Sequence, residues 1–133
     1  DLTSNKNPKY KKTASGISTS LWNRLTRGAT NMQSVKLNNR SWSLSPFRIF
    51  NPIFAYKSIG ENQKLLICNT SETAYQVTLS DIGIDKGNME QYTGSLTHDV
   101  RGELNQSDDW KVTKKAVNNT VEIPPYSITL IEE

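Results

Sequence analysis

The single histidine of the chain, His98, is the one residue on which histidine-dependent catalysis could rest. Ser95 precedes it by three positions and Asp99 follows it directly. A Ser-His-Asp mechanism requires a defined spatial arrangement of nucleophile, base and carboxylate, which closeness in sequence does not supply. We therefore interpret His98 as an exposed loop histidine and predict no catalytic residue in this segment.

Carboxylates of the kind used in glycoside hydrolysis are abundant, but their spacing selects no pair. That reaction needs two of them about 5–10 Å apart on a rigid scaffold. Twelve of the thirteen acidic residues follow residue 60. Six of these fall in segments that we expect to be loops: Asp81, Asp85, Asp99, Glu103, Asp108 and Asp109. We interpret all of them as solvated surface groups.

The sequence contains no well-defined metal or nucleotide site. Cys68 is the only cysteine, which excludes an internal disulfide and a cysteine-based zinc site. Asp81 and Asp85 lie four residues apart but lack the alternating oxygen ligands of an EF-hand loop. No glycine-rich phosphate-binding motif occurs. We predict no metal ion and no cofactor.

Planar aromatic side chains are candidates for binding carbohydrate, because their rings stack on the apolar faces of sugars. We select Trp42, Tyr92 and Trp110 as candidate substrate-binding residues. Trp42 lies in a polar stretch and is the one that we expect to be most exposed. Trp22 falls beside Leu21 in a helical pattern, and we assign it to the apolar face of that helix.

The net charge of +3 conceals a strong asymmetry. Residues 1–48 hold nine basic side chains and one acidic side chain, whereas residues 49–133 hold seven basic and twelve acidic ones. This split indicates either a basic arm for an acidic partner or two halves that attract each other, and we favour the second. A nucleic-acid or polyanion partner is the weaker alternative, because the basic charges are spread over the whole segment.

The size and composition are those of one water-soluble domain: 133 residues, 15.0 kDa, mean hydropathy −0.61 and 22% charged residues. No apolar run approaches the ~20 residues that a membrane span requires, so we expect no membrane partner. The chain does not begin with methionine and lacks a signal-peptide pattern, so we interpret it as a trimmed or excised piece. Four N-x-[ST] sequons permit a glycosylated secreted protein: Asn39, Asn69, Asn105 and Asn118.

The N-terminal third is basic and partly helical. Residues 1–15 contain few large apolar side chains, and we expect an extended or disordered lead-in there. Apolar side chains then recur every four residues, which predicts a short amphipathic helix near 17–29: Ile17, Leu21, Leu25 and Ala29. Gly28 weakens its last turn. We assign residues 1–45 to this segment and residues 46–133 to a β domain.

The pattern after residue 46 is that of short strands separated by turn residues about every 8–12 positions. The run Leu65-Leu66-Ile67-Cys68 predicts a central strand, and the alternating segment Tyr75-Gln76-Val77-Thr78-Leu79 predicts a half-buried one. With residues 47–58 these are expected to form a meander. Asn118-Asn119 predicts a tight hairpin, and Pro124-Pro125 indicates an edge position for the last strand.

About seven such strands favour an all-β fold. We predict an antiparallel two-sheet β-sandwich, preceded by the basic, partly helical segment.

Three segments resemble parts of the small β-sandwich that ends many TIM-barrel glycoside hydrolases. They are Lys64-Leu65-Leu66-Ile67-Cys68-Asn69-Thr70-Ser71, Tyr75-Gln76-Val77-Thr78-Leu79 and Val121-Glu122-Ile123-Pro124-Pro125-Tyr126-Ser127-Ile128-Thr129-Leu130. In these domains a strand ending in an Asn-Thr-Ser-like turn leads into a Val-x-Leu strand. Their last strand follows a Val-x-Ile-Pro-Pro-Tyr-Ser signature and closes the polypeptide. The resemblance covers about residues 53–133.

This resemblance implies a non-catalytic accessory domain of a glycoside hydrolase, which packs against a catalytic TIM-barrel domain or chain. Such domains sometimes contribute a loop to the substrate cleft of the barrel, and polysaccharide is the further partner that this resemblance implies. No catalytic residue is carried over, because the two acids of those enzymes lie on barrel strands. We expect a secreted or extracytoplasmic setting.

The helix near 17–29 is then the last barrel helix or a connecting segment, and we expect its apolar face to dock on the barrel. A stand-alone carbohydrate-binding module is the alternative function, with Trp42 and Tyr92 as the residues to test.

Overall fold

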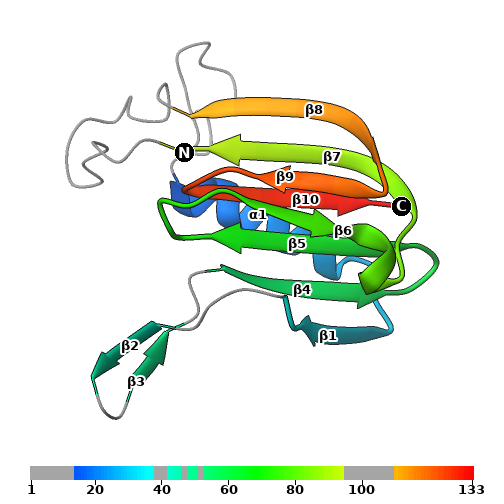
Figure 1. Cartoon of the computed structure of the whole chain (residues 1–133). Helices are drawn as coiled ribbons and strands as arrows, with labels where there is room; N and C mark the ends of the chain where they lie inside the picture. The colour runs from blue at the N-terminus through cyan, green and yellow to red at the C-terminus, as the bar shows by residue number, and fades with distance from the viewer. Residues whose placement is uncertain (1–13, 38–41, 46–47, 51–52, 95–109) are drawn as a thin grey trace.

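The computed structural model describes residues 14–37, 42–45, 48–50, 53–94 and 110–133, and of residues 14–15, 42–45 and 48–50 it describes the backbone alone. Within these ranges the chain forms one α-helix and ten strands (Figure 1). They are α1 (Ala14–Thr26), β1 (Asn31–Val35), β2 (Trp42–Ser45), β3 (Arg48–Phe50), β4 (Ile53–Ile59), β5 (Gln63–Asn69), β6 (Tyr75–Thr78), β7 (Lys86–Thr93), β8 (Lys111–Asn118), β9 (Thr120–Ile123) and β10 (Ser127–Glu132). No helix in the described ranges is both long and apolar enough to cross a membrane.

Eight of these strands form one antiparallel sheet in the order β1-β4-β5-β10-β7-β8-β9-β6, and β2 and β3 form a separate pair. The sheet folds back on itself at the β8–β9 hairpin, so that β9 and β6 lie in front of β5 and β10 (Figure 1). Asn119 in this hairpin has a φ of +67°, a left-handed conformation that asparagine tolerates. The predicted hairpin and the predicted all-β, sandwich-like fold are both confirmed.

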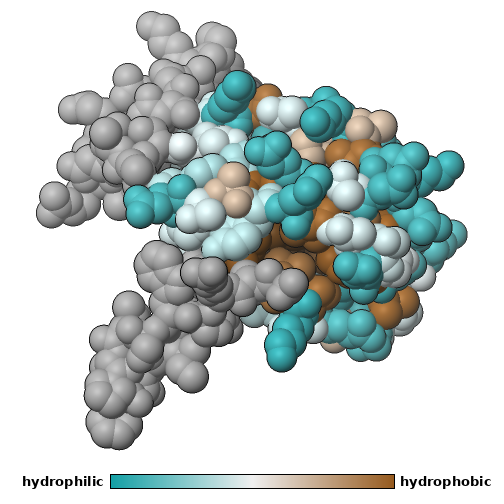
Figure 2. Space-filling view, in the orientation of Figure 1, coloured by the Kyte–Doolittle hydropathy of each residue, from teal (hydrophilic) through white to brown (hydrophobic). Residues whose placement is uncertain are grey.

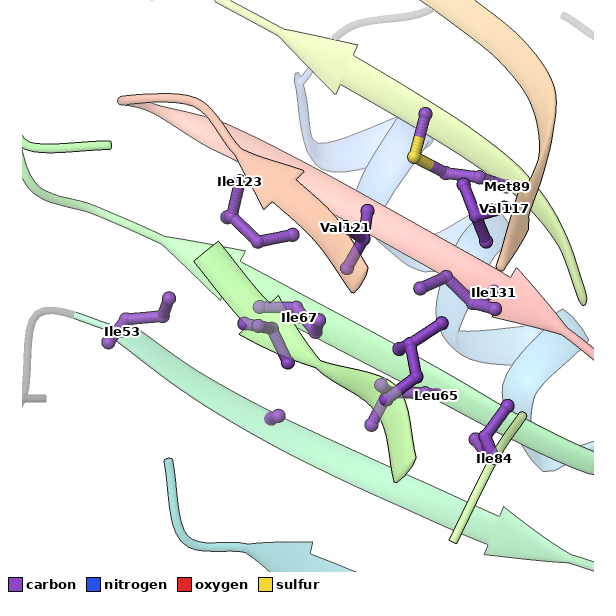
Figure 3. Packing of buried hydrophobic residues seen from close by; sticks show 12 residues of the cluster. Ile53, Leu65, Ile67, Ile84, Met89, Val117, Val121, Ile123 and Ile131 are labelled. Carbon is purple, nitrogen blue, oxygen red and sulfur yellow. The ribbon is translucent and has the colours of Figure 1, made fainter. Parts of the chain in front are cut away.

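Aliphatic side chains from β4 to β10 fill the space between the two layers (Figure 3). Leu65, Ile67, Ile123 and Ile131 are completely buried there. On β6, Val77 is buried while its two neighbours are exposed, which is the half-buried alternation expected from the sequence. Removal of this apolar surface from water, at about 25 cal/mol per Å², is the main stabilising contribution to the fold.

The helix α1 covers the opposite face of the sheet, over β5 and β10 (Figure 1). Its apolar side chains pack on those of the sheet in a second buried cluster: Ile17, Leu21 and Leu25 against Leu66 and Leu130. The expectation that this face docks on a missing barrel is therefore wrong, because the chain's own strands cover it. Burial of β5 on both faces is confirmed by the same packing.

The bounds of α1 differ from the predicted ones at both ends. The helix ends at Thr26, because Gly28 adopts a φ of +72° and terminates it. Ala14 and Ser15 are helical, so the expectation of an extended chain is wrong for these two residues. The rest of that lead-in, residues 1–13, lies outside the described residues. Pairing of β1 with β4 joins residues on both sides of the proposed division at 45/46 in one sheet.

Two topological expectations are wrong. The strand β6 pairs with β9 instead of β5, so the early strands form no meander. Both edges of β5 are already occupied by β4 and β10, and β6 therefore crosses to the other layer. The last strand, β10, is central between β5 and β7, and Pro124-Pro125 lies in the connection before it.

Candidate functional site

Three aromatic rings gather beside α1 on the outer face of β4. Phe54 and Tyr56 are two residues apart on this strand and therefore point to the same face. The ring of Trp22, on α1, contacts the ring of Tyr56 edge-on, with 5.5 Å between the ring centroids. The ring of Phe54 also contacts the ring of Tyr56 edge-on, with 6.3 Å between the centroids. Trp22 and Phe54 are 41% and 40% exposed. Together with the exposed Met32 of β1 they form a surface that we call the aromatic flank: Trp22, Met32, Phe54 and Tyr56.

The exposure of Trp22 corrects its assignment to the buried face of the helix. Leu21 and Leu25, four residues apart, point at the sheet and are buried. Trp22 is one position further on, which turns it by about 100° around the helix axis. Its ring therefore leans over β4 at the side of the helix. The sequence already indicated this position, because Trp22 lies outside the four-residue spacing of the buried side chains.

Two of the three predicted binding residues lie on the opposite side of α1 from the aromatic flank. Tyr92 of β7 and Trp110, which directly precedes β8, are half-buried against the helix-side cluster. The ring of Trp110 lies over Gly94, where an added Cβ would come within 2.6 Å of it. Trp42 begins β2, and its side chain lies outside the described residues. The structure thus brings Tyr92 and Trp110 to one flank of the sheet.

The hydroxyl of Tyr92 is engaged within the protein. It donates a 2.6 Å hydrogen bond to Oε2 of Glu90. Burial, together with this bond, raises the pKa of Tyr92 to about 12. The hydroxyl therefore stays protonated at neutral pH, and a ligand at this flank would meet the ring of Tyr92 more readily than its hydroxyl.

Arg24 of α1 joins the helix to the sheet through two carboxylates. Its Nη1 donates to Oε1 of Glu90 at 2.9 Å, and its Nη2 donates to Oε1 of Glu132. Lys64 lies 3.9 Å from Glu132 and Lys114 lies 3.7 Å from Glu90, which completes an ionic cluster. A basic residue of the first half thus meets acids of the second half, as we favoured from the charge distribution.

The same contacts set the pKa of Glu90. Burial on its own raises this pKa, but hydrogen bonds from Tyr92 and Arg24 and the nearby charges of Arg24 and Lys114 outweigh it, so the net pKa lies below the usual value. A carboxylate whose pKa is lowered by folding stabilises the protein above its unfolded-state pKa. That contribution disappears as pH falls through the folded-state pKa.

Arg24→Met keeps a long side chain and removes the charge. We expect it to lower the free energy of unfolding by about 1 kcal/mol near pH 7, as for a partly exposed charge-assisted pair. Urea unfolding at neutral pH and well below pH 4.5, the ordinary pKa of Glu90, measures the difference from wild type. This difference is expected to shrink at the lower pH. The result contradicts a stabilising ion pair between Arg24 and Glu90 if the free energy of unfolding falls equally at both pH values. An equal fall in the exposed control Lys86→Met contradicts it as well.

No cluster of three or more metal-ligating side chains occurs in the part of the chain that the structure describes. Asp81 and Asp85 are both exposed. His98 lies outside the described residues, as do five other residues considered above: Ser95, Asp99, Glu103, Asp108 and Asp109. Burial raises the pKa of the half-buried Cys68 to about 11, so its thiol is a weak nucleophile at neutral pH.

Two of the three segments that carry the glycoside-hydrolase resemblance, residues 64–71 and 121–130, meet around one buried side chain, Asn69. Its Nδ2 donates to the carbonyl oxygens of Thr73 at 2.8 Å and Pro124 at 2.9 Å, with a longer 3.4 Å contact to Ile123. Its Oδ1 accepts from the backbone N–H of Ser71 at 3.0 Å and from the Ser71 hydroxyl at 2.7 Å. The Asn-Thr-Ser turn and the Pro-Pro segment are therefore one hydrogen-bonded unit, which we call the Asn69 lock.

Burial of Asn69 also decides between two of the sequons. A glycan cannot be accommodated on a side-chain amide that is buried and hydrogen-bonded to the backbone. The folded chain therefore carries no glycan on Asn69. Asn118, at the β8–β9 hairpin, is exposed. The sequons at Asn39 and Asn105 lie outside the described residues.

No protein-family model matches the sequence, and no curated protein matches it. Among solved structures, the GH51 α-L-arabinofuranosidase of Thermotoga petrophila RKU-1 aligns with 62% of this chain at 20% identity and a TM-score of 0.46. The GH51 arabinofuranosidase of Xanthomonas axonopodis pv. citri aligns with 73% at 10% identity and a TM-score of 0.46. The arabinose-bound MgGH51 α-L-arabinofuranosidase aligns with 61% at 13% identity and a TM-score of 0.43. The alignments span 19%, 22% and 14% of those chains.

Proposed function

We propose that this chain is a non-catalytic accessory β-sandwich domain of a secreted glycoside hydrolase, and that it packs against the catalytic TIM barrel through the aromatic flank. The residue pattern supports the first part, because two of the three segments that resemble this domain type are joined in the Asn69 lock. Among the described residues Glu90 and Glu132 line one pocket, but Arg24 forms ion pairs with both carboxylates, so we assign the bond-breaking chemistry to the barrel.

The aromatic flank is the observation that carries the packing role. Single exposed apolar residues are common on protein surfaces, but contiguous exposed aromatic and methionine side chains are typical of interfaces. Trp22, Met32 and Phe54 are exposed side chains of this kind, and Tyr56 holds the two rings edge-on. Such rigid aromatic groups contribute much of the binding energy when a partner covers them.

Trp22→Ala combined with Phe54→Ala is expected to weaken binding of the catalytic domain by at least about thirtyfold, the loss for two interface anchors of about 1 kcal/mol each. Binding is measured by titrating the separately produced catalytic domain with the 133-residue chain. Both side chains are substantially exposed, so unfolding in urea should change by no more than about 1 kcal/mol.

The matched control is Val112→Ala, which removes an exposed apolar side chain on the opposite side of the helix. It is expected to leave binding unchanged. Equal weakening by the control, or full binding by the double variant, contradicts docking through the aromatic flank.

Contact with the polysaccharide extends this proposal to Tyr92, Trp110 and Trp42. The half-buried rings of Tyr92 and Trp110 share one flank, where a sugar ring can stack. Two results together favour the stand-alone carbohydrate-binding module instead. The isolated chain then binds soluble polysaccharide and loses this binding on Trp110→Ala, and it does not bind the catalytic domain.

A further inference from the structure

The two layers of the sandwich differ in width. The back layer contains β1, β4, β5, β10, β7 and β8 side by side, whereas the front layer contains β9 and β6 (Figures 1 and 3). One edge of β6 pairs with β9, and none of the described strands pairs with its other edge. Among the described strands the front layer therefore ends at β6, and they cover the part of the back layer beyond it more thinly.

In the part of the chain that the structure describes, a groove of about 280 Å³ opens along this edge of β6. All four residues of the strand, Tyr75–Thr78, line one side, and Val35, Leu37 and Ile53 line the other. These aliphatic side chains belong to, or pack against, the same cluster that fills the core. Figure 2 shows the resulting apolar hollow between β6 and β4, with hydrophilic side chains along part of its rim.

This edge of β6 is short, at four residues, but it lacks two other features that keep edge strands from pairing. Native proteins also protect such edges with charged residues and proline. Tyr75-Gln76-Val77-Thr78 contains no charged residue and no proline. The groove as a whole is lined by one cation, Lys36, and one anion, Asp81, so its lining has no net formal charge. An uncharged occupant is complementary to such a lining.

We propose that this groove binds an extended, uncharged segment of a partner polypeptide, which adds to β6 as a further strand. The backbone of the segment pairs with β6, and an apolar side chain at every second position covers Val35 and Ile53. A glycan fits the lining less well, because its hydroxyl groups would lose water against aliphatic side chains that offer no hydrogen bonds. The groove lies on the inner side of β4, whereas the aromatic flank lies on its outer face, so this inference goes beyond the proposed function and does not depend on it.

The probe is a short acetylated and amidated peptide in which valine and threonine alternate. At about 1 mM it is expected to raise the Tm of the 133-residue chain by about 2 °C or more, since a ligand of the native state stabilises it. It is also expected to shift the backbone amide NMR signals of β6 and of Val35 and Leu37. Tyr75→Lys and Val35→Lys each place an ammonium group in the groove, from opposite walls, and each should abolish the Tm rise.

Two control variants should retain the peptide-induced rise in Tm if the peptide binds in the groove. Thr19→Lys makes the same charge change as the groove variants on an exposed position of α1, and Trp22→Ala alters the aromatic flank. Circular dichroism identifies a lysine variant that fails to fold, and the other variant then decides.

Three results overturn the proposal. The first is no Tm rise in the wild-type chain, and the second is a rise that persists in the folded lysine variants. The third is a different occupant: a soluble polysaccharide that shifts the same amide signals, or a concentration-dependent dimer that Tyr75→Lys disperses. Loss of catalytic-domain binding is measured separately with the flank variants, so failure of either proposal is distinguishable from failure of the other.

Discussion

Asn69→Ala is expected to lower the free energy of unfolding by about 3–5 kcal/mol, because it leaves several buried backbone groups without partners. The amide of Asn69 bonds to carbonyl oxygens from two separate segments, including Pro124 at 2.9 Å, and its oxygen accepts two hydrogen bonds from Ser71. Alanine replaces none of these. Equilibrium unfolding in urea, followed by circular dichroism, measures the loss.

Asn88→Ala is the matched control for this prediction. Asn88 is exposed on β7, and its replacement should change the free energy of unfolding by no more than about 0.5 kcal/mol. The loss in Asn69→Ala should also include the connection before β10, since Ser127 Oγ and Asn69 Nδ2 both donate to Pro124 O. Similar losses in the two alanine variants would show that the Asn69 lock does not stabilise the fold.

Leu21→Ala is the second substitution with a large expected effect. Leu21 is 1% exposed and packs between α1 and the outer face of β5 and β10. Truncation of a fully buried leucine typically costs about 2.7–5 kcal/mol, through lost transfer free energy and the cavity that remains. We expect a loss of about 3 kcal/mol in urea unfolding, near the lower end because the site lies beneath a single helix and can partly collapse.

Loosening of the helix in Leu21→Ala should also disturb the aromatic flank. Trp22 follows Leu21 directly, and its edge-on contact with Tyr56 depends on the position of α1. The fluorescence of Trp22 is therefore expected to change, which can be isolated in a background that lacks the other two tryptophans. Thr19→Ala, at an exposed position of the same helix, should leave both stability and fluorescence unchanged. A stability loss in Leu21→Ala below about 1 kcal/mol would contradict the docking of α1 on the sheet.

Local patterns were sufficient to predict most of the elements. Alternation in Tyr75-Gln76-Val77-Thr78 and the apolar run at residues 65–68 correspond to β6 and β5, and Asn118-Asn119 lies at the predicted hairpin. Strand pairing was not predictable in the same way, because a half-buried strand has the same alternating residue pattern in either layer of the sandwich. The partner of β6 depends on β10, at the other end of the chain, which occupies the edge of β5 that a meander would need.

The candidate surface was predicted less well than the fold. Tyr92 and Trp110 were selected from residue type, and the structure places both on one flank. Trp22 was assigned to the core because it adjoins Leu21, and the difference between them is a rotation of about 100° on one helix. Phe54 and Tyr56 fall within residues 47–58, for which the sequence predicts a strand, but it does not tell which of the two faces of β4 the helix leaves open.

The most direct test of the accessory-domain account is the mass and subunit content of the native protein, measured without denaturation from its source. The account predicts that this 15.0 kDa sequence occurs with a catalytic barrel of about 250 residues, in one longer polypeptide or as a co-purifying chain. The catalytic acids are then to be sought on that barrel. A native species of 15.0 kDa alone, with no associated chain, would contradict the account and favour an independent carbohydrate-binding module.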